Sequence, residues 1–455
     1  MSRRGTIPFV RTLRRAATYG RLYGLGHRLT LEACDEAAKA GSLLAGDGAE
    51  VLIVVTDDTL FVDGVAEGEA SLQHHGFIRA LEEAGVSSVV LRGTIASDDV
   101  LALVGLLVEG SGAISAGSTV DVNTVDVTTT TLRTTPGAGL RRTYARSLDM
   151  LRGVGTALRG DQPLSLDATA SAVRDLLATG MQTPHAALLL ATVKSHHDYT
   201  FYHSVNTAIL SLALARLVGL PDEDTVLLGV GAMLHDIGKI GVSSAILGHP
   251  GRLDEDQWVE VRRHPRTGAE AILEASRPGQ EVAAAVALEH HARFDGSGYP
   301  RLVYHDGAHD HAPSGHPLHY FSRLVAVADT YDALTTRRSY RRAEAPDKAL
   351  EIIAAEAGTS YDPDFVEAFS VLLGIHPPGS FLRLDSGEVA MAIGGGAGDG
   401  ICVVVVRDRL GGVVAHPEPI TCRPSDVVEQ VPASVVGTTP TAVLDRLPAD
   451  PIGMP

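Results

Sequence analysis

The sequence has few cysteines and no long apolar stretch, and these two absences exclude several classes of protein. Cys34, Cys402 and Cys422 are far apart, odd in number and form no Cys-x-x-Cys pair. We therefore expect neither a disulfide framework nor a zinc finger. The cysteine usage also indicates a reducing compartment. No apolar run approaches the roughly 18 residues of a membrane span, and the basic N-terminus lacks a signal-peptide core. These features predict a cytoplasmic protein without a membrane span.

Basic residues are also in the minority. The chain has 38 Lys and Arg against 55 Asp and Glu, which gives a formal net charge of −17. This charge argues against binding to duplex nucleic acid, which requires a basic face. The negative net charge is still compatible with a small anionic substrate, because a metal ion with a few Lys or Arg side chains can reverse the sign of the charge inside one pocket.

Hydrophobic periodicity predicts a multidomain α+β protein, as expected for 455 residues. Residues 1–118 mix helical and strand patterns, including a helix over 72–84, and predict an α/β module whose role we take to be regulatory by analogy. Residues 119–160 are predicted to form a linker and a coupling helix. Helical spacing dominates residues 161–376, and the short apolar runs 388–393 and 401–407 predict a β-rich C-terminal segment over 377–455.

Two short segments carry most of the chemical information. One is His235-Asp236-Ile237-Gly238-Lys239; the other is His290-His291, followed by the run from Asp295 to Pro300. A metal site for phosphate chemistry needs imidazole and carboxylate groups, and both segments contain them. The neighbouring glycines leave the backbone accessible to a ligand. With three further side chains from other helices, the predicted ligands are His203, His235, Asp236, His264, His290, His291 and Asp329. A sulfur-free set of this kind suits Fe, Mn, Zn or Ni, and two metals bridged by Asp236 would use all seven.

Other residues near these segments are candidates for contacts with a phosphate or a base. Lys239 can reach a phosphate held by the metals, although an exposed lysine at a helix end is equally common. The run Asp295, Gly296, Ser297, Gly298, Tyr299 and Pro300 is either a plain tight turn or a wall of the site. Arg338 and Arg341 belong to a basic cluster that either clamps a second phosphate or forms a solvated face.

These motifs, in this order, resemble the HD-GYP family of bacterial cyclic-dinucleotide phosphodiesterases, which lies within the HD hydrolase superfamily. The resemblance covers roughly residues 168–373 and includes His203-Ser204-Val205-Asn206, His264-Pro265 and the segment from Ala328 to Thr335. It implies an HD-type helical domain, the seven metal ligands named above, and substrate contacts by Lys239, Tyr299, Arg338 and Arg341. Two departures stand out. Tyr199 replaces a glutamate that some members use for a third metal, which favours two, and Ala292 replaces the glutamate of the usual His-His-Glu.

The resemblance implies hydrolysis of cyclic di-GMP to linear pGpG, and onward to GMP, by attack of a metal-activated hydroxide. His235, Asp236 and Lys239 are then the catalytic residues, and two divalent or mixed-valence ions, iron or manganese, are the cofactors. Two alternatives remain open: a catalytically weak HD-GYP receptor for a cyclic dinucleotide that acts in signalling, and an HD hydrolase of other nucleotides. A homodimer formed through the N-terminal module or the coupling helix is also left open.

Overall fold

The structure of the 455-residue chain is a computed structural model. It describes residues 5–46, 50–110, 118–125, 138–160, 162–180, 184–193, 199–249, 251–302, 304–305, 310–311, 318–336, 343–395, 400–415, 417–444 and 446–447. The chain forms two compact units, residues 1–145 with 441–453, and residues 146–440. The multidomain α+β class is confirmed, whereas the four domain boundaries stay a prediction.

The first unit contains a five-stranded antiparallel sheet in the order β3-β2-β1-β4-β5. Its strands are β1 (Glu50–Thr56), β2 (Thr59–Val62), β3 (Val65–Ala66), β4 (Ser88–Arg92) and β5 (Val120–Val122). Asp57 and Asp58 both have positive φ angles and join β1 to β2 in a tight hairpin. Ile53 and Val55 lie in the main core, while Val54 belongs to a small cluster of its own, as strand alternation requires.

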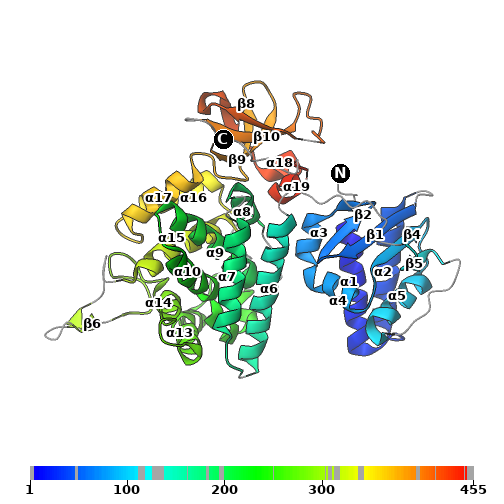
Figure 1. Ribbon diagram of the computed structural model, residues 1–455, viewed down its shortest axis with the longest axis horizontal. Coiled ribbons are helices and arrows are strands. Elements are labelled where there is room, and N and C mark those ends of the chain that lie inside the picture. The colour runs from blue at the N-terminus through cyan, green and yellow to red at the C-terminus, as the bar shows by residue number, and fades with distance from the viewer. Residues whose placement is uncertain are drawn as a thin grey trace. The chain divides into compact units, whose positions relative to one another are not determined.

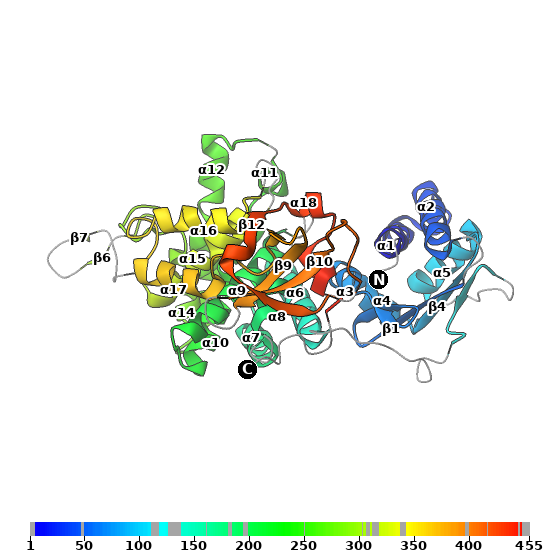
Figure 2. The same cartoon turned by 90° about the horizontal axis from the view of Figure 1, so that it is seen from above.

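Helices cover the core face of this sheet. They are α1 (Thr6–Tyr23), α2 (Arg28–Ala45), α3 (Gly68–Gln73), α4 (His75–Glu83) and α5 (Ser97–Glu109). Helices α1, α2 and α5 pack against one another above the strands (Figure 2). The prediction of a single helix over residues 72–84 was wrong. The backbone of His74 is not helical and separates α3 from α4.

The second unit is mostly helical, as predicted for its central part (Figure 1). Its helices are α6 (Ala138–Arg159), which begins in the first unit, α7 (Leu166–Gly180), α8 (Pro184–Leu190), α9 (Tyr199–Leu217), α10 (Asp222–Leu234), the 3-10 helix η2 (Ile237–Gly241), α11 (Ser244–Leu247), α12 (Glu255–Val261), α13 (His264–Ala275), α14 (Val282–Glu289), α15 (Tyr320–Thr335), α16 (Pro346–Ala355) and α17 (Pro363–Leu373). A short hairpin, β6 (Tyr304–His305) with β7 (Asp310–His311), precedes α15.

Helix α9 lies at the centre of this unit. Its side chains from Tyr202 to Ala215 are almost all buried, which is typical of a helix surrounded by others. It packs against α10 and α15, and α10 in turn packs against α14. A Cβ atom on Gly231 of α10 would lie 2.8 Å from Val286 of α14, so the glycine allows these helices to approach closely. This approach brings the C-terminal ends of α10 and α14 together.

A second five-stranded antiparallel sheet follows the helices, in the order β11-β10-β9-β8-β12. Its strands are β8 (Phe381–Leu384), β9 (Val389–Gly395), β10 (Ile401–Arg407), β11 (Pro419–Cys422) and β12 (Val427–Gln430), followed by the short helices α18 (Ala433–Val436) and α19 (Pro440–Leu444). The runs 388–393 and 401–407 correspond to β9 and β10, so the predicted β-rich segment is confirmed. Among the residues that the structure describes, no helix is both long enough and apolar enough to cross a membrane.

Candidate metal centre

All seven predicted ligands come together in the second unit, most of them from helix ends. His235 and Asp236 follow α10, His264 begins α13, and His290 and His291 follow α14. His203 and Asp329 project from within α9 and α15. Helix α9 begins at Tyr199, so His203 lies in its second turn. Every one of these side chains is buried except that of His291, which is half-buried.

The seven side chains form two groups that could each hold a metal ion. One group contains Asp236, His264, His290 and His291; the other contains His203, His235 and Asp329, and within each group the ligand atoms lie within 4.8 Å of one another.

Asp236 lies between the two groups and directs one oxygen toward each. Its Oδ1 is 3.2 Å from His264 Nε2 and 3.6 Å from His290 Nε2. Its Oδ2 is 3.5 Å from His235 Nε2 and 3.7 Å from His203 Nε2. A carboxylate in this position could supply one oxygen to an ion held by each group.

Backbone carbonyls hold three of the imidazoles in one orientation. The Nδ1 atoms of His235, His264 and His290 lie 2.7, 2.7 and 2.8 Å from the carbonyl oxygens of the residues three positions earlier. Since a carbonyl only accepts hydrogen bonds, Nδ1 carries the proton in each ring and Nε2 presents a lone pair to the cavity. The rings therefore have the tautomer that a metal ligand needs.

The cavity contains polar atoms that a cation would satisfy. The Nε2 atoms of His264 and His290 are 3.2 Å apart although both are acceptors in this tautomer. Within the described part of the chain, His235 Nε2 and Asp236 Oδ1 are buried without a hydrogen-bond partner. Such atoms are costly to bury unless a partner or an ion binds them. The donor set, imidazole with carboxylate and no sulfur, therefore fits a divalent metal.

The pKa values of the ligands agree with this assignment. Burial lowers the pKa of His235 to about 4 and also lowers the pKa values of His264 and His291, so these imidazoles are neutral near pH 7. Burial opposes ionisation of Asp236, but Lys239 and His235 outweigh it and hold the pKa of Asp236 well below its usual range. Neutral imidazoles and ionised carboxylates are the forms that bind metals.

His203 differs from the other imidazoles because two carboxylates contact it. Its Nε2 is 2.9 Å from Asp329 Oδ1, and its Nδ1 is 2.7 Å from Asp332 Oδ2. Burial alone would lower the pKa of His203, but hydrogen bonds to Asp329 and Asp332 raise it to about 9. A metal ion that binds Nε2 must therefore displace a proton from this ring.

Asp332 and Asn206 are functional candidates that sequence reasoning missed. Asn206 Nδ2 donates to Asp332 Oδ1 at 3.0 Å and to the carbonyl oxygen of Val193 at 3.0 Å, so it holds the carboxylate that contacts His203. The signal was available in the spacing, since Asn206 lies three residues after His203 and Asp332 three residues after Asp329. Side chains three apart share a helix face, so both had to lie near the ligands.

Lys239 and Gly238 lie against the ligands from η2. Lys239 Nζ is 2.6 Å from Asp236 Oδ2, and the lysine side chain is 16% exposed. A Cβ atom on Gly238 would lie 2.1 Å from the carbonyl oxygen of His264, so only glycine allows η2 to pack this closely against α13. Lys239 is thus positioned to neutralise charge on Asp236, and its side chain is partly exposed.

The Gly-Tyr-Pro turn is held directly against His291. The backbone N–H of Tyr299 donates to the His291 carbonyl at 3.1 Å, and the peptide bond between Tyr299 and Pro300 is cis. Gly298 has a φ of +94°, and a Cβ atom there would lie 2.3 Å from the His291 carbonyl oxygen. The Tyr299 ring centroid lies 4.5 Å from that of His291. The turn therefore lies directly beside one of the predicted ligands, and its role as a wall of the site stays a prediction.

Other predicted substrate contacts have different surroundings. The Asp295 carboxylate is exposed and accepts hydrogen bonds from the N–H and hydroxyl groups of Ser297, which lower its pKa and close the turn at Gly296. Arg338 and Arg341 lie outside the described residues. The aromatic ring of Tyr199 stacks on His203 at a centroid distance of 5.4 Å and offers no carboxylate for a third metal.

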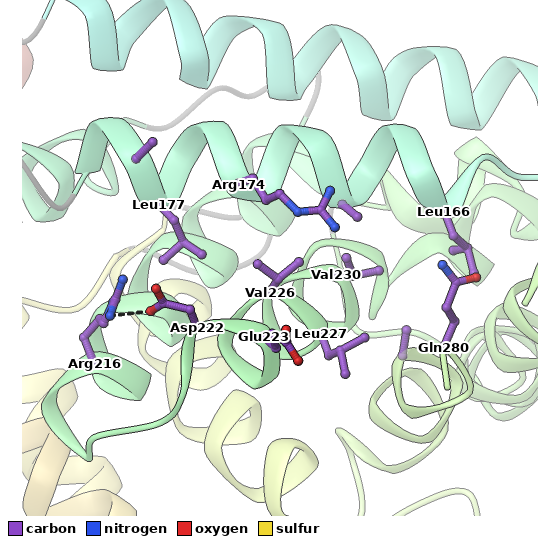
Figure 3. A pocket seen from close by; sticks show the side chains of 13 residues that line it. Leu166, Arg174, Leu177, Arg216, Asp222, Glu223, Val226, Leu227, Val230 and Gln280 are labelled. Atoms are coloured by element: carbon purple, nitrogen blue, oxygen red, sulfur yellow. Dashed lines mark ion pairs between the residues drawn. The ribbon is translucent and has the colours of Figure 1, made fainter. Parts of the chain in front are cut away.

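A cavity elsewhere in this unit contains none of the predicted site residues. It is a groove of about 710 Å³ between α7 and α10, with an apolar floor that includes Leu177, Val226 and Val230 (Figure 3). An ion pair of 2.6 Å between Arg216 and Asp222 lies at one end. The groove has none of the imidazole and carboxylate chemistry of the metal centre, so the centre remains the candidate active site.

Comparison with known proteins agrees with this geometry. Residues 187–365 match the family model described as "HD domain". This part of the chain is therefore similar to HD domains.

Three curated relatives align with part of the chain. It is 35% identical over 221 residues to a cyclic di-GMP phosphodiesterase of Pseudomonas aeruginosa, covering 49% of this chain and 50% of that protein. It is 37% identical over 185 residues to a 3′3′-cGAMP-specific phosphodiesterase of Vibrio cholerae, covering 41% and 38%. A cyclic di-GMP phosphodiesterase response regulator of Xanthomonas campestris is 39% identical over 155 residues, covering 34% and 38%. The aligned region thus spans half or less of the length of these relatives.

Proposed function

We propose that this protein is a metal-dependent phosphodiesterase that hydrolyses cyclic di-GMP to linear pGpG and then to GMP. The observation that carries the proposal is the position of Asp236, whose two oxygens face two separate groups of buried ligands. The names of the relatives support a cyclic dinucleotide as the substrate.

Two metal ions, iron or manganese, fit the ligand groups. His264, His290 and His291 would hold one ion, His203, His235 and Asp329 the other, with Asp236 between them. Ions bound in this way supply Lewis-acid chemistry and an activated water for attack on a phosphodiester. The stacked Tyr199 ring at His203 supports two ions in preference to three.

The protein's own groups then orient the substrate and compensate its charge. Lys239, whose ammonium group already lies at Asp236, is placed to neutralise negative charge that grows on the phosphate oxygens. Tyr299 and the turn around it limit the space beside His291. The buried ligand shell excludes bulk water, which strengthens each of these interactions.

The direct test is hydrolysis of cyclic di-GMP by the protein purified with iron or with manganese, followed by separation of pGpG and GMP. A double variant, His235→Ala with Asp236→Ala, is the matched control, because it removes one ligand of the second group and the bridge between the two groups. We expect hydrolysis by the wild type alone. Equal rates for both proteins would contradict the proposal.

A second substrate is favoured by one of the relatives, which is named for 3′3′-cGAMP. Comparison of kcat/KM for cyclic di-GMP, 3′3′-cGAMP and GTP shows which cyclic dinucleotide is preferred. The value for GTP tests the alternative that the protein hydrolyses other nucleotides. Tight binding of a cyclic dinucleotide by a protein that contains no metal would favour the receptor alternative.

A further inference from the structure

Three side chains form a row that leads from the metal centre toward the surface, and we call them the outer ladder: Tyr299, Arg262 and Trp258. The centroid of the Tyr299 ring lies 4.5 Å from the centroid of the His291 ring. The guanidinium carbon of Arg262, which caps the C-terminus of α12, lies 5.7 Å from the centroid of Tyr299. The same carbon lies 5.2 Å from the centroid of Trp258, one turn earlier. The ladder thus runs from a predicted metal ligand to α12. Figure 2 shows α12 projecting from the other helices of this unit.

The guanidinium group of Arg262 is held by two aromatic rings and not by a carboxylate. Arg262 is exposed, and within the described residues no carboxylate lies within 4.0 Å of its guanidinium group. By contrast, the exposed Arg277 pairs with Asp167 at 3.1 Å. The two aromatic rings hold the Arg262 guanidinium in place while its N–H donors remain available. Such a group binds a phosphate with a fixed geometry.

Trp258 offers a flat apolar surface next to this cation. It is the only tryptophan of the chain and is 40% exposed. The Tyr299 ring already contacts the rings of His291 and His264 and the guanidinium of Arg262, whereas the one ring or cation contact of Trp258 among the described residues is Arg262. Trp258 is therefore the better stacking surface for a base, a contact that every purine can make.

We propose that Arg262 and Trp258 bind the part of the cyclic dinucleotide that is remote from the reacting phosphate. A cyclic dinucleotide carries two phosphates and two bases, so one phosphate and at least one base remain for other groups while the first phosphate lies at the metal centre. Arg262 takes the second phosphate and Trp258 stacks on a purine. This assignment rests on the proposed function and names the residues that select a dinucleotide over a smaller phosphodiester.

Steady-state kinetics with two substrates test the assignment. Trp258→Ala and Arg262→Gln should each raise KM for cyclic di-GMP about tenfold and change kcat little, because the contacts are remote from the reacting bond. Both variants should hydrolyse bis(p-nitrophenyl) phosphate, which is too small to reach the ladder, at the wild-type rate. Trp258→Phe keeps an aromatic face and should restore a KM close to that of the wild type. Arg277→Gln is the control for loss of an exposed arginine.

Intrinsic fluorescence gives a second readout, because all tryptophan emission comes from Trp258. A phosphorothioate analogue of cyclic di-GMP that resists hydrolysis should quench this emission in the wild type and much less in Arg262→Gln at equal concentration, whereas GMP should have little effect.

Unchanged KM values in both variants, with unchanged emission and normal turnover of cyclic di-GMP by the wild type, would overturn the ladder assignment and leave the proposed function standing. Turnover of bis(p-nitrophenyl) phosphate without any turnover of a cyclic dinucleotide would overturn both.

Discussion

Asp332 Oδ2 lies 2.7 Å from His203 Nδ1, so a carboxylate outside the predicted ligand set orients one of the predicted ligands. Both side chains are buried, and Asn206 binds the other oxygen of Asp332. A hydrogen bond of this type fixes the ring orientation of a metal-binding histidine and increases its basicity. The affinity of the metal centre therefore depends on residues beyond the seven ligands.

Replacing Asp332 should weaken metal binding without removing a ligand. Asp332→Asn keeps the shape of the side chain but loses its charge, and we expect metal affinity to fall about 10- to 100-fold. Competition with a chromogenic chelator measures this change. Asp222→Asn, at the exposed ion pair with Arg216, is the control. An unchanged affinity in Asp332→Asn would contradict the positioning role.

Removing the ammonium group of Lys239 should slow the reaction while the metals stay bound. Lys239→Met retains most of the side-chain volume but cannot neutralise Asp236 or a phosphate, so we expect kcat to fall by about 100-fold, the usual order for loss of one stabilising donor. Metal content should be close to that of the wild type. Lys348→Met removes an exposed lysine that pairs with Glu351 and should leave kcat unchanged. A normal kcat of the Lys239→Met variant would contradict a role of Lys239 in catalysis.

Gly238 should be required for packing rather than for chemistry. The Cβ atom of alanine would lie 2.1 Å from the carbonyl oxygen of His264, so Gly238→Ala should lower the free energy of unfolding by about 1–3 kcal/mol. Gly241, three residues later in η2, has no atom within 4 Å of a built Cβ, and Gly241→Ala is the matched control. Urea denaturation of both variants measures the difference. Equal stability of the two would contradict the close contact.

Much of the site could be predicted because its chemistry lies in short local motifs. His235 with Asp236 and His290 with His291 are adjacent in sequence, and their helix-end positions follow from apolar spacing that stops beside glycine or a polar turn. The prediction that Asp236 bridges two metals followed from counting ligands. The resemblance to a known family placed His203, His264 and Asp329 in the same site.

The rest depends on tertiary packing that periodicity does not report. Asp332 and Asn206 lie in quoted motifs, but nothing local indicates that they contact each other and His203. Arg262 and Trp258 look like ordinary surface residues of a short helix until the fold brings Tyr299 against Arg262. Likewise, the apolar pattern of the sequence continues without a break across His74, although the helix itself is interrupted there between α3 and α4.

His74 in the first unit should titrate at unusually low pH. It is buried, and neither ring nitrogen has a hydrogen-bond partner within the described residues. Burial, with Arg14 and Arg11 nearby, lowers its pKa from 6.5 to about 4. Because the folded unit binds this proton less readily than the unfolded chain, the unit should be fully stable above pH 6.5 and lose stability as the pH falls from 6.5 toward 4.

Two measurements check the behaviour of His74. The imidazole resonance that disappears in His74→Gln should titrate with a pKa near 4 in NMR spectra of the wild type. The same variant should lose less stability than the wild type between pH 6.5 and 4. A resonance that titrates near 6.5 would contradict the buried, unpaired ring.

The proposed function depends above all on one buried centre that would hold two metals, with Asp236 between them. Its most direct test is the metal content per chain, measured by mass spectrometry on protein purified with iron or manganese and freed of loosely bound ions. We predict two ions per chain in the wild type and at most one in Asp236→Ala, in which the bridge is missing. Fewer than two ions in the wild type, or two ions retained in Asp236→Ala, would contradict the account.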